Sequence, residues 1–263
     1  MNLALKQVLL GTSLGRAAQA ARETYRLLTT PFVALGTEVN DQLAGRLAVQ
    51  LCPEDGTFVD VGAHIGSVMA EVAFRRPKAR VIAFEAVPEK ARALRRKFPN
   101  ATVHCCALSD MEGERSFFID LDRPGFSSLA NSGGSVREIK VDARRLDTVL
   151  ADERADVVKV DVEGAELGVF MGGGDLVDRC RPVLMFESGP GNPAGYTKED
   201  MFDWLAKRNY GVFAPNRIAH TGSAMSLDTF LDSHEYPRRT TNYFALPMER
   251  AEDIRARARS FRD

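Results

Sequence analysis

The stretch TFVDVGAHIGSV, residues 57–68, places an acid and two glycines where a β-type pattern gives way to a helical one. Asp60 lies near the end of the apolar run, and Gly62 and Gly66 follow it. A glycine lets the backbone turn and approach a ligand, or lets the next helix pack closely. The spacing departs from the G-x-G-x-x-G of dinucleotide folds and from the GxxxxGK[ST] phosphate loop. The stretch predicts a ligand site at the first strand–helix turn and leaves the ligand open.

Outward from this turn, short apolar runs alternate with segments of helical periodicity. The predicted strands lie at residues 57–63, 79–86, 101–109, 155–162, 181–188, 210–215 and 242–247. Several are almost continuously apolar, as strands covered on both faces must be. The alternation predicts a Rossmann-like, doubly wound α/β sheet of about seven mostly parallel strands with helices on both faces. Two further β segments, 115–121 and 137–146, flank a loop rich in glycine and serine.

The chain divides into three predicted segments. Residues 1–52 are expected to form an N-terminal helical extension, residues 53–247 the α/β domain, and residues 248–263 a charged, solvated C-terminal tail helix. No apolar run approaches the roughly 18 residues of a membrane span. The amphipathic start is explained better by a helix than by a signal peptide. Peripheral contact of that helix with a membrane is an alternative that the sequence leaves open.

Composition narrows the class of protein. The 35 basic and 36 acidic residues nearly cancel, which argues against a nucleic-acid partner. The four cysteines form no CxxC pair and no disulfide framework, so we expect reduced thiols in a cytoplasmic protein. The sequence does not decide between a monomer and an oligomer.

A second acid indicates which ligand the first turn binds. Glu85 ends the second apolar run, at the predicted ligand edge of the sheet, where a carboxylate can accept hydrogen bonds from a ribose diol. Nicotinamide folds share this feature. Asp60 in the first turn would repel a pyrophosphate, however, and would suit the amino group of a methionine moiety. The two acids together favour S-adenosylmethionine.

Several motifs then resemble those of the FkbM-type methyltransferases, within the class I S-adenosylmethionine-dependent enzymes. The resemblance covers residues 57–247 and rests on FVDVGAHIG, VIAFEAVPE, CALSDMEGE, GFSSL, LDTVL, VVKVDVEGAELGVF and LMFES. KVDVEGAE, residues 159–166, is its most diagnostic segment. The resemblance implies a class I methyltransferase domain that binds S-adenosyl-L-methionine and releases S-adenosyl-L-homocysteine. It also implies O-methylation of a small hydroxylated acceptor, namely a sugar, a glycolipid or a glycosylated or polyketide-type metabolite.

The same resemblance implies a cofactor-binding set. Its methionine, ribose and adenine sides are expected at Asp60, Gly62, Ala63, His64, Gly66, Glu85, Ala86, Ala107, Leu108, Ser109, Ser128 and Asp161. Many relatives carry Asn where this chain has His64, and we expect a tolerated loop substitution there. Ser127 and Ser128 of GFSSL are either plain turn residues or part of a loop over the ligand.

The predicted catalytic residues lie at the ends of the middle strands. If residues 157–162 form a strand, Asp161 and Glu163 share a face with Lys159, and one carboxylate can be held ionised while the other gains a raised pKa. Glu187, after the next strand, is a further candidate base. A structural cluster, with Lys159 pairing Glu163, is the alternative. The three acids would suit Mg²⁺ or Ca²⁺, but the resemblance does not demand a metal and none is predicted.

Two other functions stay open at this point. The acceptor could be a nitrogen, a protein or an RNA, or the chain could be a catalytically silent cofactor-binding partner protein. The late histidines His220 and His234 are expected at the surface.

Overall fold

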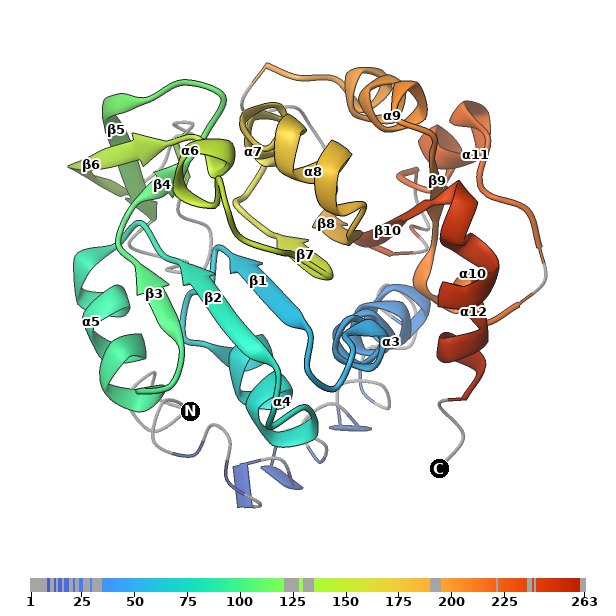
Figure 1. The fold of residues 1–263 in the computed structure, drawn as a ribbon, viewed down its shortest axis with the longest axis horizontal. Coiled ribbons are helices and arrows are strands. Elements are labelled where there is room, and N and C mark those ends of the chain that lie inside the picture. Colours follow the sequence, from blue (N-terminus) through green and yellow to red (C-terminus); the bar gives the residue numbers. More distant parts are fainter. Residues whose placement is uncertain are drawn as a thin grey trace.

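The computed structural model describes residues 35–120, 128–129, 135–189, 195–220, 222–235, 238 and 240–260, with isolated positions between 9 and 29. Its main feature is a seven-stranded sheet with the strand order β3-β2-β1-β7-β8-β10-β9 (Figure 1). The strands are β1 (Thr57–Val61), β2 (Arg80–Phe84), β3 (Thr102–His104), β7 (Val157–Val160), β8 (Val183–Glu187), β9 (Tyr210–Phe213) and β10 (Asn242–Pro247).

The strand order places a switch point beside β1. This strand pairs in parallel with β2 on one side and with β7 on the other, so the chain winds outward in both directions. Only β10 runs antiparallel among the described strands of this sheet. Every residue of β1 and β7 is buried, which explains why most of their side chains are apolar. The Rossmann-like, mostly parallel sheet predicted from the sequence is confirmed.

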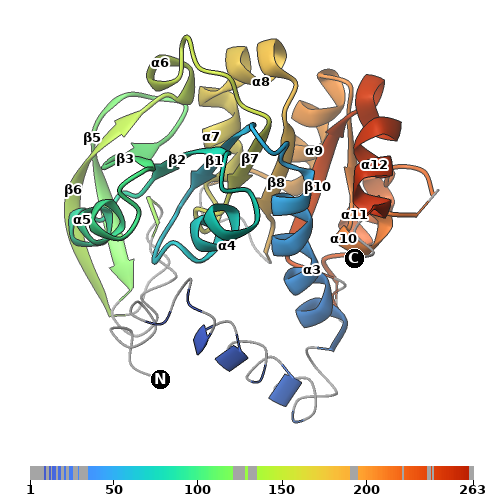
Figure 2. The same cartoon turned by 60° about the horizontal axis from the view of Figure 1, so that its bottom comes forward.

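Helices cover both faces of the sheet (Figures 1 and 2). One face is covered by α3 (Leu35–Leu51), α4 (Ser67–Arg75), α5 (Pro88–Lys97), α10 (Pro215–Ile218) and α12 (Ala251–Arg259), which follows the 3₁₀ turn Met248–Arg250. The other face is covered by α6 (Leu146–Val149), α7 (Glu166–Gly172), α8 (Gly174–Cys180), α9 (Lys198–Lys207) and α11 (Leu227–Asp232). Two apolar cores therefore sandwich the sheet.

A second, smaller sheet lies beside β2 and β3. It contains β4 (Ala107–Leu108), β5 (Gly113–Asp120) and β6 (Val136–Arg144) in the order β4-β6-β5. The single strand expected at residues 101–109 was therefore wrong. The chain leaves the main sheet after β3, and β4 instead pairs in parallel with β6. This departure carries β4 and the β5–β6 hairpin over the carboxyl edge of the main sheet.

Helices α3 and α12 pack against the main sheet. Helix α3 buries Leu47 and Leu51 in the same core as α12, and α12 buries Ile254 and Ala258 there. The expectation of a solvated tail helix was wrong, because one side of α12 is apolar at helical spacing. The predicted boundaries at residues 52/53 and 247/248 stay predictions, and most of residues 1–34 lie outside the described part of the chain.

Candidate active site

Lys159 joins the first strand–helix turn to the end of β7. Its Nζ lies 3.1 Å from Asp60 Oδ1 and 3.4 Å from Asp161 Oδ2. The same atom donates hydrogen bonds to the carbonyl oxygens of Val61 and Gly62, at 3.4 and 3.0 Å. Burial alone would lower the pKa of Lys159, but the two carboxylates outweigh it and raise that pKa. The buried ammonium group therefore stays charged and fixes both turns at once.

The first turn needs its glycines for reasons inside the protein. Gly62 has φ +78°, and a Cβ there would lie 1.9 Å from the carbonyl oxygen of Asp161. Gly66 has φ +82°, and its Cβ would lie 2.6–2.7 Å from Phe98 and Leu94, at and just beyond the end of α5. Gly62 also lines the cavity described below, but the Asp161 carbonyl already excludes a side chain. A ligand-approach role for either glycine stays a prediction.

Glu85 lies at the end of β2 with its carboxylate turned toward the first turn. Its Oε2 accepts a hydrogen bond from the backbone N–H of His64, and its Oε1 accepts one from that of Val87, both at 2.8 Å. The side chain is 6 % exposed, and burial raises the pKa of Glu85 while the charge of Lys90 opposes that rise. Each carboxylate oxygen keeps a second lone pair for a ligand.

His64 sits in a strained position of the first turn. Its φ is +50°, in the left-handed region where Asn, Asp and His are enriched among residues other than glycine. His64 is therefore a residue type that tolerates this backbone, as Asn would be. Ala63 beside it is buried, and its N–H donates to the carbonyl of Phe84 at 3.0 Å.

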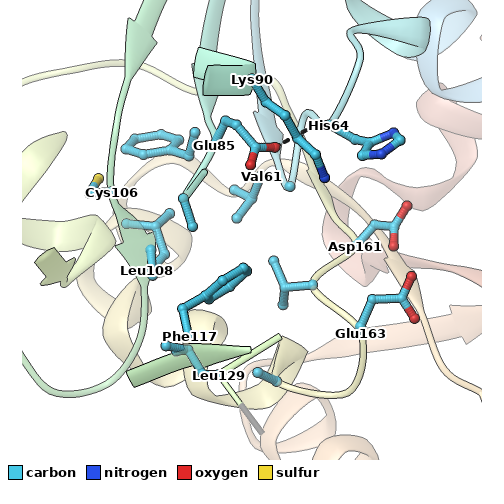
Figure 3. Close-up of a pocket in the computed structure, with 16 residues that line it drawn as sticks. Val61, His64, Glu85, Lys90, Cys106, Leu108, Phe117, Leu129, Asp161 and Glu163 are labelled. Atoms are coloured by element: carbon cyan, nitrogen blue, oxygen red, sulfur yellow. Dashed lines mark hydrogen bonds between the residues drawn. The ribbon is translucent and has the colours of Figure 1, made fainter. Parts of the chain in front are cut away.

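An open cavity of about 570 Å³ lies at the carboxyl ends of β1, β2 and β7 (Figure 3). The cavity lies at the switch point of the sheet, which is where such folds bind ligands. Glu85 and Lys90 lie above the cavity in Figure 3, and Asp161 and Glu163 lie along one side. The apolar walls are formed by Val61, Phe84, Ala86, Cys106, Ala107, Leu108, Phe117, Leu129, Val162 and Ala165.

The structure brings together only part of the predicted site residues in this cavity. Its lining includes Gly62, His64, Glu85, Ala86, Ala107, Leu108, Asp161 and Glu163. The other predicted residues are not among the lining residues: Asp60, Ala63, Gly66, Ser109, Ser128, Lys159 and Glu187. Ser109, for example, donates from Oγ to Oδ1 of Asp110 at 3.0 Å. The cofactor roles of all these residues stay predictions.

Three carboxylates gather at the ends of β7 and β8. Asp161, Glu163 and Glu187 each have an oxygen within 4.8 Å of the others. Strand β7 ends at Val160, and Glu163 has φ +58°, so the strand expected through residue 162 was wrong. The cluster still forms for two reasons. The register of β7 with β8 places Asp161 beside Glu187, and the irregular turn after β7 brings the carboxylate of Glu163 close to both.

The carboxylates of this cluster differ in their environments. Burial and the charges of Asp161 and Glu163 raise the pKa of Glu187 far above its usual range. A protonated Glu187 can donate a hydrogen bond to Asp161, which also forms an ion pair with Lys159. Among the described residues, the ion pairs of Lys159 are with Asp60 and Asp161, and Glu163 is not one of its partners. Such a set can accept a proton and return one, and its oxygens could also hold a hard cation.

Ser128 contacts the turn that follows β7. Its Oγ lies 3.3 and 3.2 Å from the carbonyl oxygens of Val162 and Glu163. Its backbone exchanges two hydrogen bonds with Phe118 of β5. Ser127 lies outside the described residues.

The two late histidines have different surroundings. His220 is exposed, as expected, but His234 is buried and the expectation of a surface position was wrong. His234 Nδ1 lies 2.8 Å from the carbonyl oxygen of Phe230, and its Nε2 lies 2.8 Å from Ser188 Oγ. Aromatic side chains around it, Tyr243 among them, exclude water from the ring.

Sequence reasoning missed several residues at the site. Lys90 lines the cavity from α5, Phe117 lines it from β5, and Leu129 lines it from the segment between β5 and β6. Glu166 is 5 % exposed and hydrogen bonds to the backbone of the 161–165 turn. Its only sequence signal was its place at the end of KVDVEGAE.

None of the helices in the described part of the chain is long and apolar enough to cross a membrane.

Segments of this chain are similar to the AMB antimetabolite synthetase AmbE of Pseudomonas aeruginosa (31 % identity, 50 % of this chain and 8 % of that protein) and to Methyltransferase 1 of Beauveria bassiana (28 %, 46 % and 59 %). Methyltransferase sdnD of Sordaria araneosa is 28 % identical over 46 % of this chain and 61 % of its own length. The chain thus spans less than two thirds of each of these relatives.

Among solved structures, the chain is similar to the methyltransferase FkbM of Methylobacillus flagellatus. That likeness has a TM-score of 0.46 and 18 % identity, over 73 % of this chain and 44 % of the other. The family model for the methyltransferase FkbM domain matches residues 60–212, more than half of the chain, from Asp60 in the first turn to Val212 in β9. This chain therefore belongs to the FkbM methyltransferase family.

Proposed function

We propose that this chain is an S-adenosylmethionine-dependent O-methyltransferase acting on a hydroxyl of a sugar, a glycolipid or a glycosylated or polyketide-type metabolite. One observation above all supports the proposal. A carboxylate cluster, Asp161 and Glu163 with Glu187 behind them, stands beside a cavity that also contains the free lone pairs of Glu85. Two of the similar proteins are named methyltransferases, and the third is named an antimetabolite synthetase, which favours a small-molecule acceptor.

The residues present fit the cofactor. When bound, S-adenosylmethionine supplies a methyl group that is already activated for transfer. Glu85 would accept hydrogen bonds from the ribose hydroxyls, and the apolar side chains of Ala107 and Leu108 would pack against the adenine ring. The acids Asp60 and Asp161 would favour the cationic amino end of the methionine moiety. A pyrophosphate, in contrast, would meet these carboxylates without a glycine-rich cradle.

The carboxylate cluster would serve the acceptor. A sugar hydroxyl is a weak nucleophile, so a positioned base that takes its proton as the new bond forms accelerates transfer. Asp161 and Glu163 line the cavity and are the proposed proton acceptors, whereas the raised pKa of Glu187 favours its protonated form, which can donate to Asp161. The chain's main task is then to hold the acceptor oxygen in line with the methyl group.

Calorimetric titration of the purified chain tests the first half of the proposal. We expect S-adenosylmethionine and S-adenosylhomocysteine to bind with one-to-one stoichiometry and NAD to give no heat of binding. Binding of NAD alone would overturn the proposal. The acceptor is then sought by comparing metabolites of cells with and without the gene, where a methylated product should lose about 14 mass units, one CH₂, per site. Cofactor binding with no change in any hydroxylated metabolite would favour the silent-partner alternative.

A further inference from the structure

The turn at residues 161–165 forms one wall of the cavity. Its backbone conformation depends on contacts with side chains from outside these residues. Asp161, Val162, Glu163 and Ala165 all line the cavity. Glu163 and Gly164 have φ values of +58° and +95°, the first of which is strained for any side chain larger than glycine. The N–H of Asp161 still donates to the carbonyl of Val61 at 3.1 Å, but β7 ends at Val160 and α7 begins at Glu166, so residues 162–165 lie outside both regular elements. Contacts from other side chains must therefore maintain the turn.

Glu166 supplies the acceptor for this turn. Its Oε1 accepts hydrogen bonds from the backbone N–H groups of Val162 and Gly164, each at 3.0 Å. The carboxyl group is buried, so water cannot replace it for these two donors. Both donors flank Glu163, and one oxygen atom thus fixes the backbone on either side of the strained residue.

Ser128 supplies the donor from the opposite side. Its single hydroxyl hydrogen is shared between the carbonyl oxygens of Val162 and Glu163. The serine is itself buried and held by the paired backbone hydrogen bonds to Phe118. The small sheet therefore fixes the carbonyl side of the same turn whose N–H side Glu166 fixes.

We propose that Glu166 and Ser128 are positioning residues that clamp the 161–165 turn and thereby hold the carboxylates of Asp161 and Glu163 beside Glu187. The proposal rests on the proposed function, because the clamp matters to catalysis only if these carboxylates serve the acceptor. It explains why the final acid of KVDVEGAE and a serine of GFSSL occur together, although neither side chain is part of the described cavity lining.

The clamp predicts different results for two substitutions of similar size. In Glu166→Gln the amide oxygen can still accept from both N–H groups, whereas Glu166→Leu removes the acceptor. A misplacement of about 1 Å at a reacting centre can lower a rate about 100-fold. We expect Glu166→Leu to lower kcat about 100-fold and Glu166→Gln to stay within about threefold. Ser128→Ala, which loses one shared hydrogen bond, should lower kcat about tenfold.

Amide hydrogen exchange tests the clamp without any acceptor. Backbone exchange at Val162 and Gly164, measured by NMR on the full chain, should be at least about tenfold faster in Glu166→Leu than in the wild type and unchanged in Glu166→Gln. The matched controls are Glu199→Leu, at an exposed position of α9, and Ser116→Ala, at a half-buried position of β5. The unfolding transition of each variant, followed by circular dichroism, identifies any that fail to fold, and Glu166→Gln and Ser128→Ala keep the test open in that case.

The outcomes separate the two proposals. Wild-type exchange at Val162 and Gly164 in both Glu166→Leu and Ser128→Ala would overturn the clamp, whatever the activity. Protection lost in Glu166→Leu and kept in Glu166→Gln would support it, even if the wild type bound no S-adenosylmethionine and the proposed function failed. With an acceptor in hand, a fall in kcat that Gln rescues would establish the positioning role, and equal kcat values for Leu and Gln would overturn it.

Discussion

The ammonium nitrogen of Lys159 lies 3.1 Å from a carboxylate oxygen of Asp60, and both side chains are buried between β1 and β7. Neighbouring positions in the parallel register bring the two groups together beneath the first turn. Burial raises the pKa of Asp60, and the charge of Lys159 opposes that rise. The buried carboxylate of Asp60 is therefore stabilised by the charge of Lys159.

Removing Lys159 should destabilise the fold, because it leaves a buried carboxylate without a counter-charge. We expect Lys159→Met to lower the free energy of unfolding by about 3–5 kcal/mol in urea titrations. Arg154→Met, which removes the exposed partner of Asp156, should cost about 0–1 kcal/mol. The double variant Asp60→Asn, Lys159→Met should recover part of the loss. If Lys159→Met were as stable as Arg154→Met, Lys159 would not be the required counter-charge of Asp60.

Removing the carboxylate of Glu85 should weaken cofactor binding and spare the fold elsewhere. Hydrogen bonds to a charged group contribute about 1.5–3 kcal/mol each. The dissociation constant of S-adenosylhomocysteine should therefore rise about 10–100-fold in Glu85→Ala, measured by calorimetry. Glu89→Ala, an exposed acid on the first turn of α5, is the matched control and should bind like the wild type. Equal affinities for the two variants would remove Glu85 from the proposed cofactor site.

The members of the carboxylate cluster should respond unequally to amide substitution. Asp161→Asn removes a proposed proton acceptor, so turnover should fall about 10²–10⁴-fold. The raised pKa of Glu187 favours its neutral form, so Glu187→Gln should retain most of the activity. Glu163→Gln shows whether the second cavity-lining carboxylate shares the role of base. Normal turnover in both Asp161→Asn and Glu163→Gln would mean that neither is the base.

The backbone at His64 should accept Asn and reject a β-branched residue. A left-handed conformation costs about 1–2 kcal/mol for most side chains and more for branched ones, whereas Asn tolerates it. We expect His64→Asn to unfold within about 0.5 kcal/mol of the wild type, as surface substitutions do. His64→Val should be at least about 1 kcal/mol less stable. Chemical denaturation monitored by tryptophan fluorescence gives both values. A Val variant as stable as the Asn variant would contradict the left-handed backbone conformation of residue 64.

Stability should fall with acid through the titration of His234. Burial lowers the pKa of His234 to about 4, against an ordinary value of 6.5. Below pH 6.5 the imidazole of His234 is protonated in the unfolded chain but stays neutral in the folded protein. The stability present above pH 6.5 is therefore lost as pH falls toward 4. The loss from this group is about 3 kcal/mol at most. Urea titrations from pH 7.5 to 4 should show a smaller decrease for His234→Gln, and an equal decrease would show that the ring is not the titrating group.

The sequence predicted the parts of the fold that depend on local pattern. Continuous apolar runs located β1, β2, β7 and β8, because strands covered on both faces tolerate few polar residues. The acids at strand ends, Glu85 among them, followed from the rule that parallel strands present one edge to ligands. The prediction of one strand over residues 101–109 was wrong, because the hydrophobicity of this run does not show that β4 pairs within a second sheet.

Other parts of the site depend on tertiary contacts that no periodicity encodes. The carboxylates of Asp161 and Glu163 meet through a turn with positive φ values and not through the alternation of a strand. Lys90 resembles the solvated lysines of its helix in sequence, and only the packing of α5 directs it to the cavity. The burial of one side of α12 could have been predicted, since Ala251, Ile254 and Ala258 recur at helical spacing.

The contact between Gly62 and the carbonyl oxygen of Asp161 limits how this protein can acquire new substrates. A side chain at position 62 would meet that oxygen at 1.9 Å, so neither loop can be remodelled independently of the other. Substitutions that alter the acceptor by moving the backbone of residue 161 would disturb the first turn as well. Changes of substrate range are therefore more accessible through Phe117 and Leu129, which line the same cavity from outside the two constrained loops.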